Sequence, residues 1–200
     1  MLNDLFYIGS CDQFGTISGL RLGRLDTEHV PWDEINAAWG QCTLLLATLM
    51  KLLEFRSAKC NLYPLGSYSR ISAVHDDSNK FELFCSDAAF TRMISRFNNA
   101  QKLFLECLEE FQMYAEIQFQ GSLIMPYKIS GHKISGFSIT LDINHKDSWT
   151  RALRFMLQIL KTLLVWCVKE KQMASHYVCY TLERLRISLL RYLKKPAEKS

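Results

Sequence analysis

The stretch HDDSN, residues 75–79, places a histidine beside two aspartates. A histidine next to a carboxylate can move protons in general acid–base catalysis, so this stretch is a candidate for chemistry. The same residue types also form solvated turns, because Asp, Ser and Asn side chains bond to nearby backbone groups. Composition favours the turn, and we expect residues 75–79 to form a polar loop.

Two acidic pairs, Asp33-Glu34 and Glu109-Glu110, are the other candidates for paired carboxylates. Adjacent residues on a helix point in different directions, so neither pair would share a proton. The sequence has no nucleophile elbow, no HExxH and no glycine-rich phosphate motif. We therefore expect no catalytic site and predict that the chain is not an enzyme.

The seven cysteines are scattered, and no two of them form a CxxC pair. Several fall on apolar stripes, where a free cysteine behaves as a small hydrophobic residue. This usage predicts a reducing compartment, the cytosol or nucleus. The five histidines are isolated from one another and from the cysteines, so we expect no metal site and no cofactor.

The formal net charge is +4, and it is unevenly distributed. Residues 169–200 hold eight Lys and Arg against three Asp and Glu, a net of +5, so the first 168 residues sum to −1. A nucleic-acid-binding domain carries its basic charge on the folded body, so this distribution argues against a nucleic-acid partner. The sequence also lacks a secretory signal, and its apolar runs are far shorter than the ~20 residues of a membrane span.

Residues 13–50 contain the stretch around which we expect the chain to pack. A strand is predicted over residues 14–25, after a first strand at residues 5–8 and a turn at residues 9–12. Pro31 suits the first position of the helix that follows, with Thr27 as a possible cap. From residue 35 to residue 53 the helix is apolar on most sides, which predicts a buried helix. Its stripe is Ile35, Ala38, Trp39, Cys42, Leu46, Leu49 and Leu53, widened by Ala37, Leu44 and Leu45.

Gly15, Gly19 and Gly23 recur every four residues in this first strand region. That spacing can mark paired membrane helices, but Arg21 and Arg24 intervene and the context is β. We therefore expect close backbone packing or bulges at these glycines.

The pattern of strands followed by a helix occurs three times. Strands are predicted over residues 58–65, 68–74 and 81–85, then a helix over residues 98–119. A hairpin of residues 123–129 and 134–143 precedes a third helix, with Asp147 as its cap and a stripe from Trp149 to Cys167 facing inward. We predict an α+β fold of three repeats, approximately residues 5–56, 57–120 and 121–172, in one domain of residues 1–172.

Residues 173–200 differ from the body. Val178, Leu182, Leu185, Leu189 and Tyr192 are spaced as one helical stripe, and five basic residues lie mostly off it: Arg184, Arg186, Arg191, Lys194 and Lys195. A basic amphipathic helix can lie on an anionic membrane or dock a partner. It can also pack on its own domain with a charged outer face, which we favour.

An ordered series of motifs resembles the beclin family of autophagy proteins. The first and most specific is QFGTISGLRLGRL (13–25), and the others follow in order: WDEINAAWGQ (32–41), LLL (44–46), YPLGSYS (63–69), FCS (84–86), RF (96–97), FLEC (104–107), MPYKI (125–129) and WTRALRFML (149–157). The resemblance covers residues 5 to about 166 and is to the C-terminal β-sheet–α-helix repeated, autophagy-specific (BARA) domain. The extension at residues 169–200 and the divergent loops resemble fungal members.

The resemblance implies a fold of three sheet–helix repeats and a role as a regulatory subunit. The implied partners are a class III phosphatidylinositol 3-kinase catalytic subunit, its kinase-like regulatory subunit and a second coiled-coil subunit, with weak contact to anionic membrane. The implied roles are autophagy and endosome-to-vacuole sorting, with a cytoplasmic location, peripheral on endosome, vacuole and autophagosome-forming membranes. A pure protein-docking module that uses the C-terminal helix is the alternative.

The family also has an aromatic finger that contacts lipid, in a loop before the second helix. Aligned through residues 84–86 and 96–97, the finger falls on Thr91, Arg92 and Met93, none of which is aromatic. Phe90 precedes them and can substitute. The resemblance therefore implies a membrane-contact loop at residues 87–95, centred on Phe90, Thr91, Arg92 and Met93.

Overall fold

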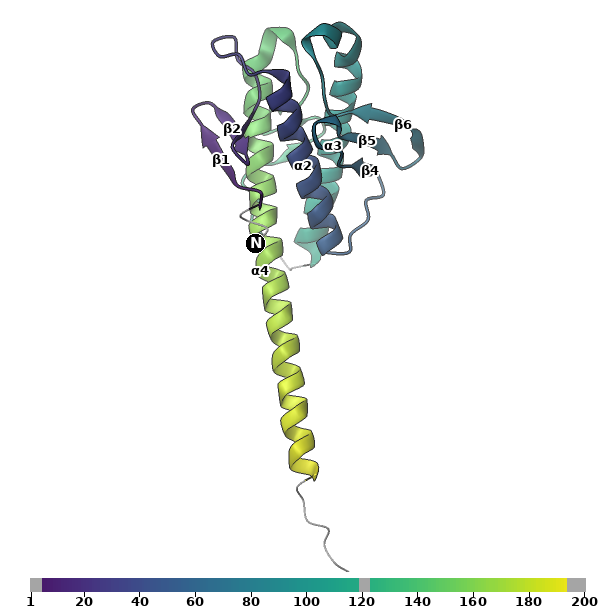
Figure 1. Cartoon of the computed structure of the whole chain (residues 1–200), viewed down its shortest axis with the longest axis vertical. Helices are drawn as coiled ribbons and strands as arrows, with labels where there is room; N and C mark the ends of the chain where they lie inside the picture. The colour runs from purple at the N-terminus through teal and green to yellow at the C-terminus, as the bar shows by residue number, and fades with distance from the viewer. Residues whose placement is uncertain (1–4, 119–122, 194–200) are drawn as a thin grey trace, which may run out of the picture.

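The computed structural model describes residues 5–118 and 123–193, with side chains described as far as residue 171 except at residue 143. The described residues form three antiparallel sheets of three strands, each followed by a long helix (Figure 1). The predicted α+β class and the three sheet–helix units are confirmed.

The first sheet is the meander β1 (Ile8–Cys11), β2 (Phe14–Ile17) and β3 (Leu20–Leu22). Between β2 and β3 the chain reverses at Ser18 and Gly19, whose φ angles are +51° and +80°. The single strand predicted over residues 14–25 is therefore wrong. The strand predicted at residues 5–8 begins only at Ile8, and the turn that follows it is at Asp12 and Gln13.

Helix α2 (Trp32–Leu52) buries the face that the sequence predicts, including Ile35, Trp39 and Leu46. Leu44 was expected to widen this face but is 43% exposed, because the helical period places it on the opposite side. Pro31 is the N-cap with an extended ψ of 147°, not the first helical residue. Among the described residues no side-chain hydrogen bond caps this helix, so Thr27 is not a cap.

The second unit holds the largest differences from the predicted elements. Its elements are β4 (Cys60–Tyr63), a 3₁₀ turn (Gly66–Tyr68), β5 (Arg70–Ala73), β6 (Asp76–Glu82), a second 3₁₀ turn (Asp87–Ala89) and α3 (Phe90–Gln118). The expected polar loop at residues 75–79 is mostly strand β6, an exposed strand whose polar residues face water. Helix α3 begins eight residues before the predicted start at residue 98, so the expected loop at residues 87–95 is a 3₁₀ turn and the first turns of α3.

The third sheet consists of three two-residue strands, β7 (Ile129–Ser130), β8 (Lys133–Ile134) and β9 (Phe137–Ser138). The strand predicted over residues 134–143 breaks at Ser135 and Gly136, which both have positive φ. A 3₁₀ turn (Ile143–His145) then leads into α4, and its cap is Asp142, whose carboxylate accepts from the Asn144 N–H at 3.0 Å. Asp147 is thus not the cap but lies in the first turn of α4.

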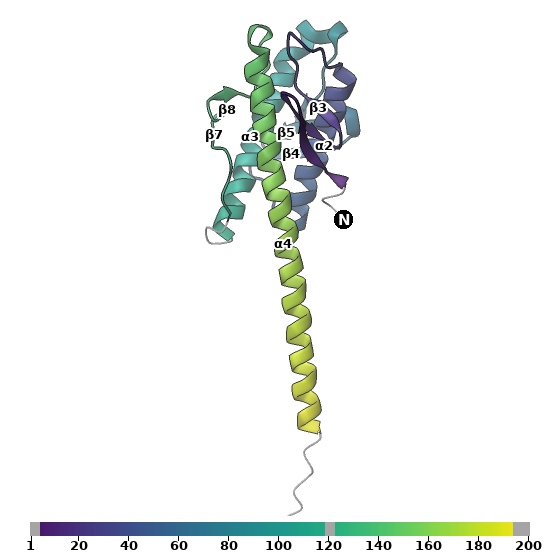
Figure 2. The same ribbon diagram turned by 90° about the vertical axis from the view of Figure 1, so that its left-hand side faces the viewer.

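Helix α4 (Lys146–Leu193) runs without a break past residue 172, where the sequence suggested a separate C-terminal helix. Figures 1 and 2 show its second half projecting away from the body rather than folding back onto it. The C-terminal helix is therefore the continuation of α4, and the packed arrangement that we favoured is not what the structure has.

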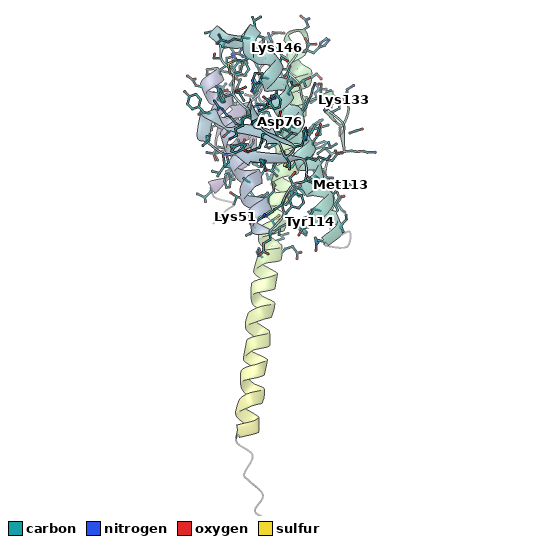
Figure 3. All side chains as sticks on the ribbon, turned by 90° about the vertical axis from the view of Figure 1, so that its right-hand side faces the viewer. Lys51, Asp76, Met113, Tyr114, Lys133 and Lys146 are labelled. Atoms are coloured by element: carbon teal, nitrogen blue, oxygen red, sulfur yellow. The ribbon has the colours of Figure 1, made fainter. Side chains whose placement is uncertain are left out.

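The three long helices begin at the same end of the body. In Figure 3, Lys146 at the beginning of α4 lies at one end, whereas Lys51 of α2 and Tyr114 of α3 lie near the other. Phe97 of α3 is buried between the helices near this end. Its ring contacts those of Trp32, Trp39 and Trp149 edge-on, at centroid distances of 5.6, 6.3 and 6.3 Å. One buried phenylalanine thus packs against tryptophans from both other helices.

Two of the three regularly spaced glycines allow the first sheet to approach α4. A Cβ on Gly15 would lie 2.8 Å from Leu157 Cδ1 and 3.0 Å from the Arg154 Cα, and a Cβ on Gly23 would lie 2.6 Å from Thr150 Cγ2. Gly19, in contrast, serves the turn and has open space beside it. This placement agrees with close packing against strands rather than with paired membrane helices.

Candidate functional site

The end of the body where the helices begin is organised around Arg24. Its side chain is only 12% exposed, and its guanidinium donates to the Val30 carbonyl from Nε at 3.3 Å and from Nη2 at 3.2 Å. The same guanidinium pairs with Asp87 at 3.1 Å and lies 4.8 Å from the centre of the Trp32 ring. Arg24 therefore ties the loop after β3 to the beginning of α2 and to the turn before α3.

Asp87 of the second unit accepts hydrogen bonds from two residues of the first unit. Its Oδ1 accepts from Arg24 and also from Trp32 Nε1 at 2.9 Å. The hydrogen bond from Arg24 is the main cause that lowers the pKa of Asp87, so the carboxylate stays ionised. Close by, Asn36 holds the chain before this turn, donating to the Cys85 carbonyl at 2.8 Å and accepting from the Cys85 N–H at 2.9 Å.

The four residues predicted to contact membrane form the first turn of α3, directly after the 3₁₀ turn Asp87–Ala89. Phe90 is half-buried, with its ring 6.1 Å from that of Trp32, and Met93 is half-buried against the core. Thr91 and Arg92 are exposed. The structure thus brings the four residues together on a fixed helical turn, with two directed inward and two outward.

The predicted basic face of the tail lies at or beyond the limit of the described residues. Arg184, Arg186 and Arg191 lie on the helical backbone of α4, but their side chains are outside the described part. Lys194 and Lys195 are outside it altogether. This face stays a prediction.

The groups that suggested catalysis are not brought together as a catalytic pair. The carboxylate of Asp77 accepts from Ser72, Tyr63 and Asn61, and these hydrogen bonds lower its pKa to about 2, rather than pairing it with His75. Glu34 is paired with Arg21 at 2.8 Å, and Glu110 accepts from Ser57 and from the Ala58 N–H. Within residues 5–118 and 123–171, one residue of each acidic pair, Glu34 or Glu110, therefore serves a structural contact.

The described cysteines, Cys11, Cys42, Cys60, Cys85, Cys107 and Cys167, are free thiols, and all but Cys11 are buried. Burial raises the pKa of Cys42 and raises that of Cys167 to about 12, which keeps both as neutral thiols. In the part of the chain that the structure describes, no group of three or more His, Cys, Asp or Glu could hold a metal ion. In that same part of the chain, no helix is long and apolar enough to cross a membrane.

Sequence reasoning missed Arg24, Asn36 and Asp87, the residues that hold this end together. Asn36 gave a signal, because it is a polar residue on the most apolar side of a helix predicted to be buried. Arg24 and Asp87 gave none, since their pairing joins positions 63 residues apart.

Comparison with known proteins identifies the family to which this fold belongs. The profile of the Apg6 BARA domain matches residues 1–169. The chain belongs to this family. The resemblance to the beclin family is thereby confirmed.

Relatives of this BARA domain come from plants, animals and fungi. The chain is 40% identical over 176 residues to "Beclin-1-like protein" of Arabidopsis thaliana, covering 84% of the chain and 33% of the relative. It is 35% identical over 175 residues to "Beclin-1" of Xenopus tropicalis, covering 83% and 39%. It is 38% identical over 188 residues to "Vacuolar protein sorting-associated protein atg6" of Schizosaccharomyces pombe, covering 88% and 40%. The chain thus spans less than half the length of these relatives.

Proposed function

We propose that this BARA domain is a non-enzymatic regulatory and membrane-adapting part of class III phosphatidylinositol 3-kinase complexes. In this proposal it acts in autophagy and endosome-to-vacuole sorting, on the cytoplasmic side of endosome, vacuole and autophagosome-forming membranes. Its partners are the lipid kinase, the kinase-like regulatory subunit and a second coiled-coil subunit. The observation that carries the proposal is family membership over residues 1–169, with relatives named for beclin and for vacuolar sorting.

The membrane contact is proposed for the first turn of α3. Fully burying one Phe and one Met contributes roughly 2–3 kcal/mol each. One arginine near anionic lipid adds about 1 kcal/mol. The sum of about 5–7 kcal/mol corresponds to a Kd no tighter than roughly 10 µM. It is an upper bound because Phe90 and Met93 are already half-buried. Such a contact orients a complex that other subunits hold at the membrane.

Liposome flotation of the chain tests this contact. The variants Phe90→Asp and Met93→Asp should lose binding to anionic vesicles, and Arg92→Gln, at an exposed position, should weaken it without affecting folding. The control is Ile117→Asp, which removes a 75% exposed apolar residue from the opposite end of α3. If the Phe90, Met93 and Arg92 variants float as the unaltered chain and the control do, the first turn of α3 is not the lipid contact.

The second candidate function is a protein-docking module without direct lipid contact. It is supported by the projection of α4 beyond the body, since a helix without tertiary packing has little stability of its own. Deletion of residues 174–200 tests it by co-purification with each subunit of the complex. Loss of one partner with an unchanged unfolding temperature supports docking through α4, whereas retention of every partner excludes it.

A further inference from the structure

A hollow of about 520 Å³ lies along the first three turns of α4. Figure 2 shows this part of α4 between the first sheet on one side and the third sheet on the other. Gln13 enters the hollow from the β1–β2 turn, Phe137 from β9, and Arg151 and Arg154 from α4. The hollow is therefore built by two units of the fold that meet on one helix.

Arg151 and Arg154 are one turn apart and line the same hollow. The Arg151 guanidinium lies 4.9 Å from the centre of the Phe137 ring, and this cation–π contact helps to orient the guanidinium. The Arg154 backbone lies against Gly15, and this close approach places the β1–β2 hairpin beside the hollow. Among the described residues, neither guanidinium forms an ion pair or donates a hydrogen bond to another side chain or carbonyl.

This lack of partners contrasts with the other arginines near α4. Arg21 and Arg24 both have their donors engaged, by Glu34 and Glu28 and by Asp87 and Val30. The hydroxyl of Thr150, which also lines the hollow, is used by the backbone of Arg24. Among the described side chains that line the hollow, the donors left free to a ligand are thus the two guanidinium groups and the exposed Gln13 amide.

One part of the hollow's lining is aromatic, whereas most of the rest is polar. Phe155 stacks on Tyr127 with ring centroids 4.0 Å apart, and Phe137 meets Phe155 edge-on at 5.7 Å. Arg151 is exposed and Arg154 is half-buried, so water still screens both charges. The aromatic side chains exclude water from one side, which gives an anion held by the arginines a modest gain over bulk water.

We propose that this hollow binds a phosphomonoester group. Two guanidinium forks match the oxygens of a tetrahedral phosphate, each donating two N–H groups. Asp147 also lines the hollow, so the lining charge is +1, and in this field a doubly charged anion gains about twice the Coulomb energy of a singly charged diester or carboxylate. A phosphomonoester carries about −1.5 to −2 at neutral pH and is favoured. The group is either a soluble phosphate compound or a lipid headgroup.

Binding of the full chain to glycerol 3-phosphate, followed by calorimetry, tests the site in solution. Arg151→Gln and Arg154→Gln should each weaken binding by about tenfold or more, and Asp147→Asn should strengthen it. The matched control is Lys161→Gln, which removes one charge from an exposed position on the same helix. Equal losses in all three charge-removing variants, or no loss in either arginine variant, would overturn the proposal.

The source of the phosphate is settled with vesicles of phosphatidylcholine doped with phosphatidic acid or with phosphatidylserine. Arginine-dependent binding to the phosphatidic acid vesicles that far exceeds glycerol 3-phosphate binding assigns a lipid headgroup, whereas similar affinities assign a soluble ligand. Equal binding to both lipids contradicts a phosphomonoester site. Arg151→Lys, which keeps the charge but not the fork, should fold normally and still weaken binding.

The site does not depend on the proposed membrane contact of α3. The soluble arm contains no membrane, and the Phe90 and Met93 variants leave all lining residues of the hollow unchanged. If those variants fail to float but still bind glycerol 3-phosphate, the result concerns only the membrane contact of α3 and not the phosphate site.

Discussion

The Thr150 hydroxyl closes a two-way hydrogen bond with the backbone of Arg24. It accepts from the Arg24 N–H at 2.9 Å and donates to the Arg24 carbonyl at 2.7 Å. These groups come from residues 126 positions apart, on α4 and on the chain after β3. One buried hydroxyl therefore satisfies both backbone groups of the residue that organises the helix beginnings.

Replacing this hydroxyl should be costly. Thr150→Val keeps the shape of the side chain but leaves a backbone N–H and C=O unpaired, and we expect a loss of about 2–4 kcal/mol of unfolding free energy. Urea denaturation measures it. Thr162→Val is the control, because Thr162 only donates to the Gln158 carbonyl within the same helix. Similar losses in both variants would contradict the role given to Thr150.

Gly23 is required by the same contact. It has a φ of +135°, and an added Cβ would meet Thr150 Cγ2 at 2.6 Å. We expect Gly23→Ala to cost about 3 kcal/mol or more, combining backbone strain with overpacking. Gly19→Ala should cost only about 1–2 kcal/mol, since φ is +80° there with nothing within 4 Å. In a double-mutant cycle, Thr150→Ser should relieve part of the Gly23→Ala loss by removing Cγ2.

Two fully buried tryptophans allow the contribution of a hydrogen bond to stability to be separated from that of packing. Trp149 Nε1 donates to Gln101 Oε1 at 2.6 Å, whereas Trp39 Nε1 has no hydrogen-bond partner among the described residues. Trp39→Phe and Trp149→Phe remove a similar side-chain volume, but only Trp149→Phe leaves a buried acceptor, Gln101 Oε1, without its hydrogen bond. We expect Trp149→Phe to be more destabilising by about 1–3 kcal/mol. Equal unfolding midpoints for the two variants would contradict this assignment.

The sequence predicts the helices far better than the strands. The stripes around Trp39, Phe104 and Leu157 repeat with the helical period over many residues, and each proved buried. Strand limits depended instead on Ser18 and Ser135, which adopt positive φ although they are not glycine. Serine at a turn resembles serine in a strand until the backbone is known, so both predicted long strands were placed wrongly.

The candidate site was predictable only in part. The position of residues 90–93 came from family motifs, but the 3₁₀ turn before them is tied to the first unit by long-range contacts of Asp87 with Arg24 and Trp32. The pairing of Arg151 with Phe137 likewise depends on how the third sheet packs on α4. No local pattern carries such information, because the partners are set by packing of whole units.

Acid should weaken the contact between Glu34 and Arg21. The hydrogen bond from Arg21 lowers the folded-state pKa of Glu34 below its usual value. A lowered pKa stabilises the fold above the unfolded pKa, and that stability is lost as the pH falls through the folded value. Unfolding free energy should therefore decrease from about pH 5 downward, and less steeply in Glu34→Gln. Asp33→Asn, at the exposed neighbouring position, should leave the slope unchanged, and a slope that is the same in Glu34→Gln would count against the pair.

Arg24→Lys should loosen the beginning of α3 without unfolding the domain. A lysine ammonium has three donors on a flexible stem and cannot contact Val30, Asp87 and the Trp32 face with one planar group. The 3₁₀ turn at Asp87–Ala89 would then lose its tie to Arg24, while the aromatic contacts of Phe97 stay in place. Hydrogen exchange at residues 87–93 should become several-fold faster, with α4 protected as before. The control is Arg92→Lys, which makes the same change at an exposed position in the first turn of α3. Unchanged exchange in Arg24→Lys would mean that the tryptophan–aspartate hydrogen bond alone holds the turn.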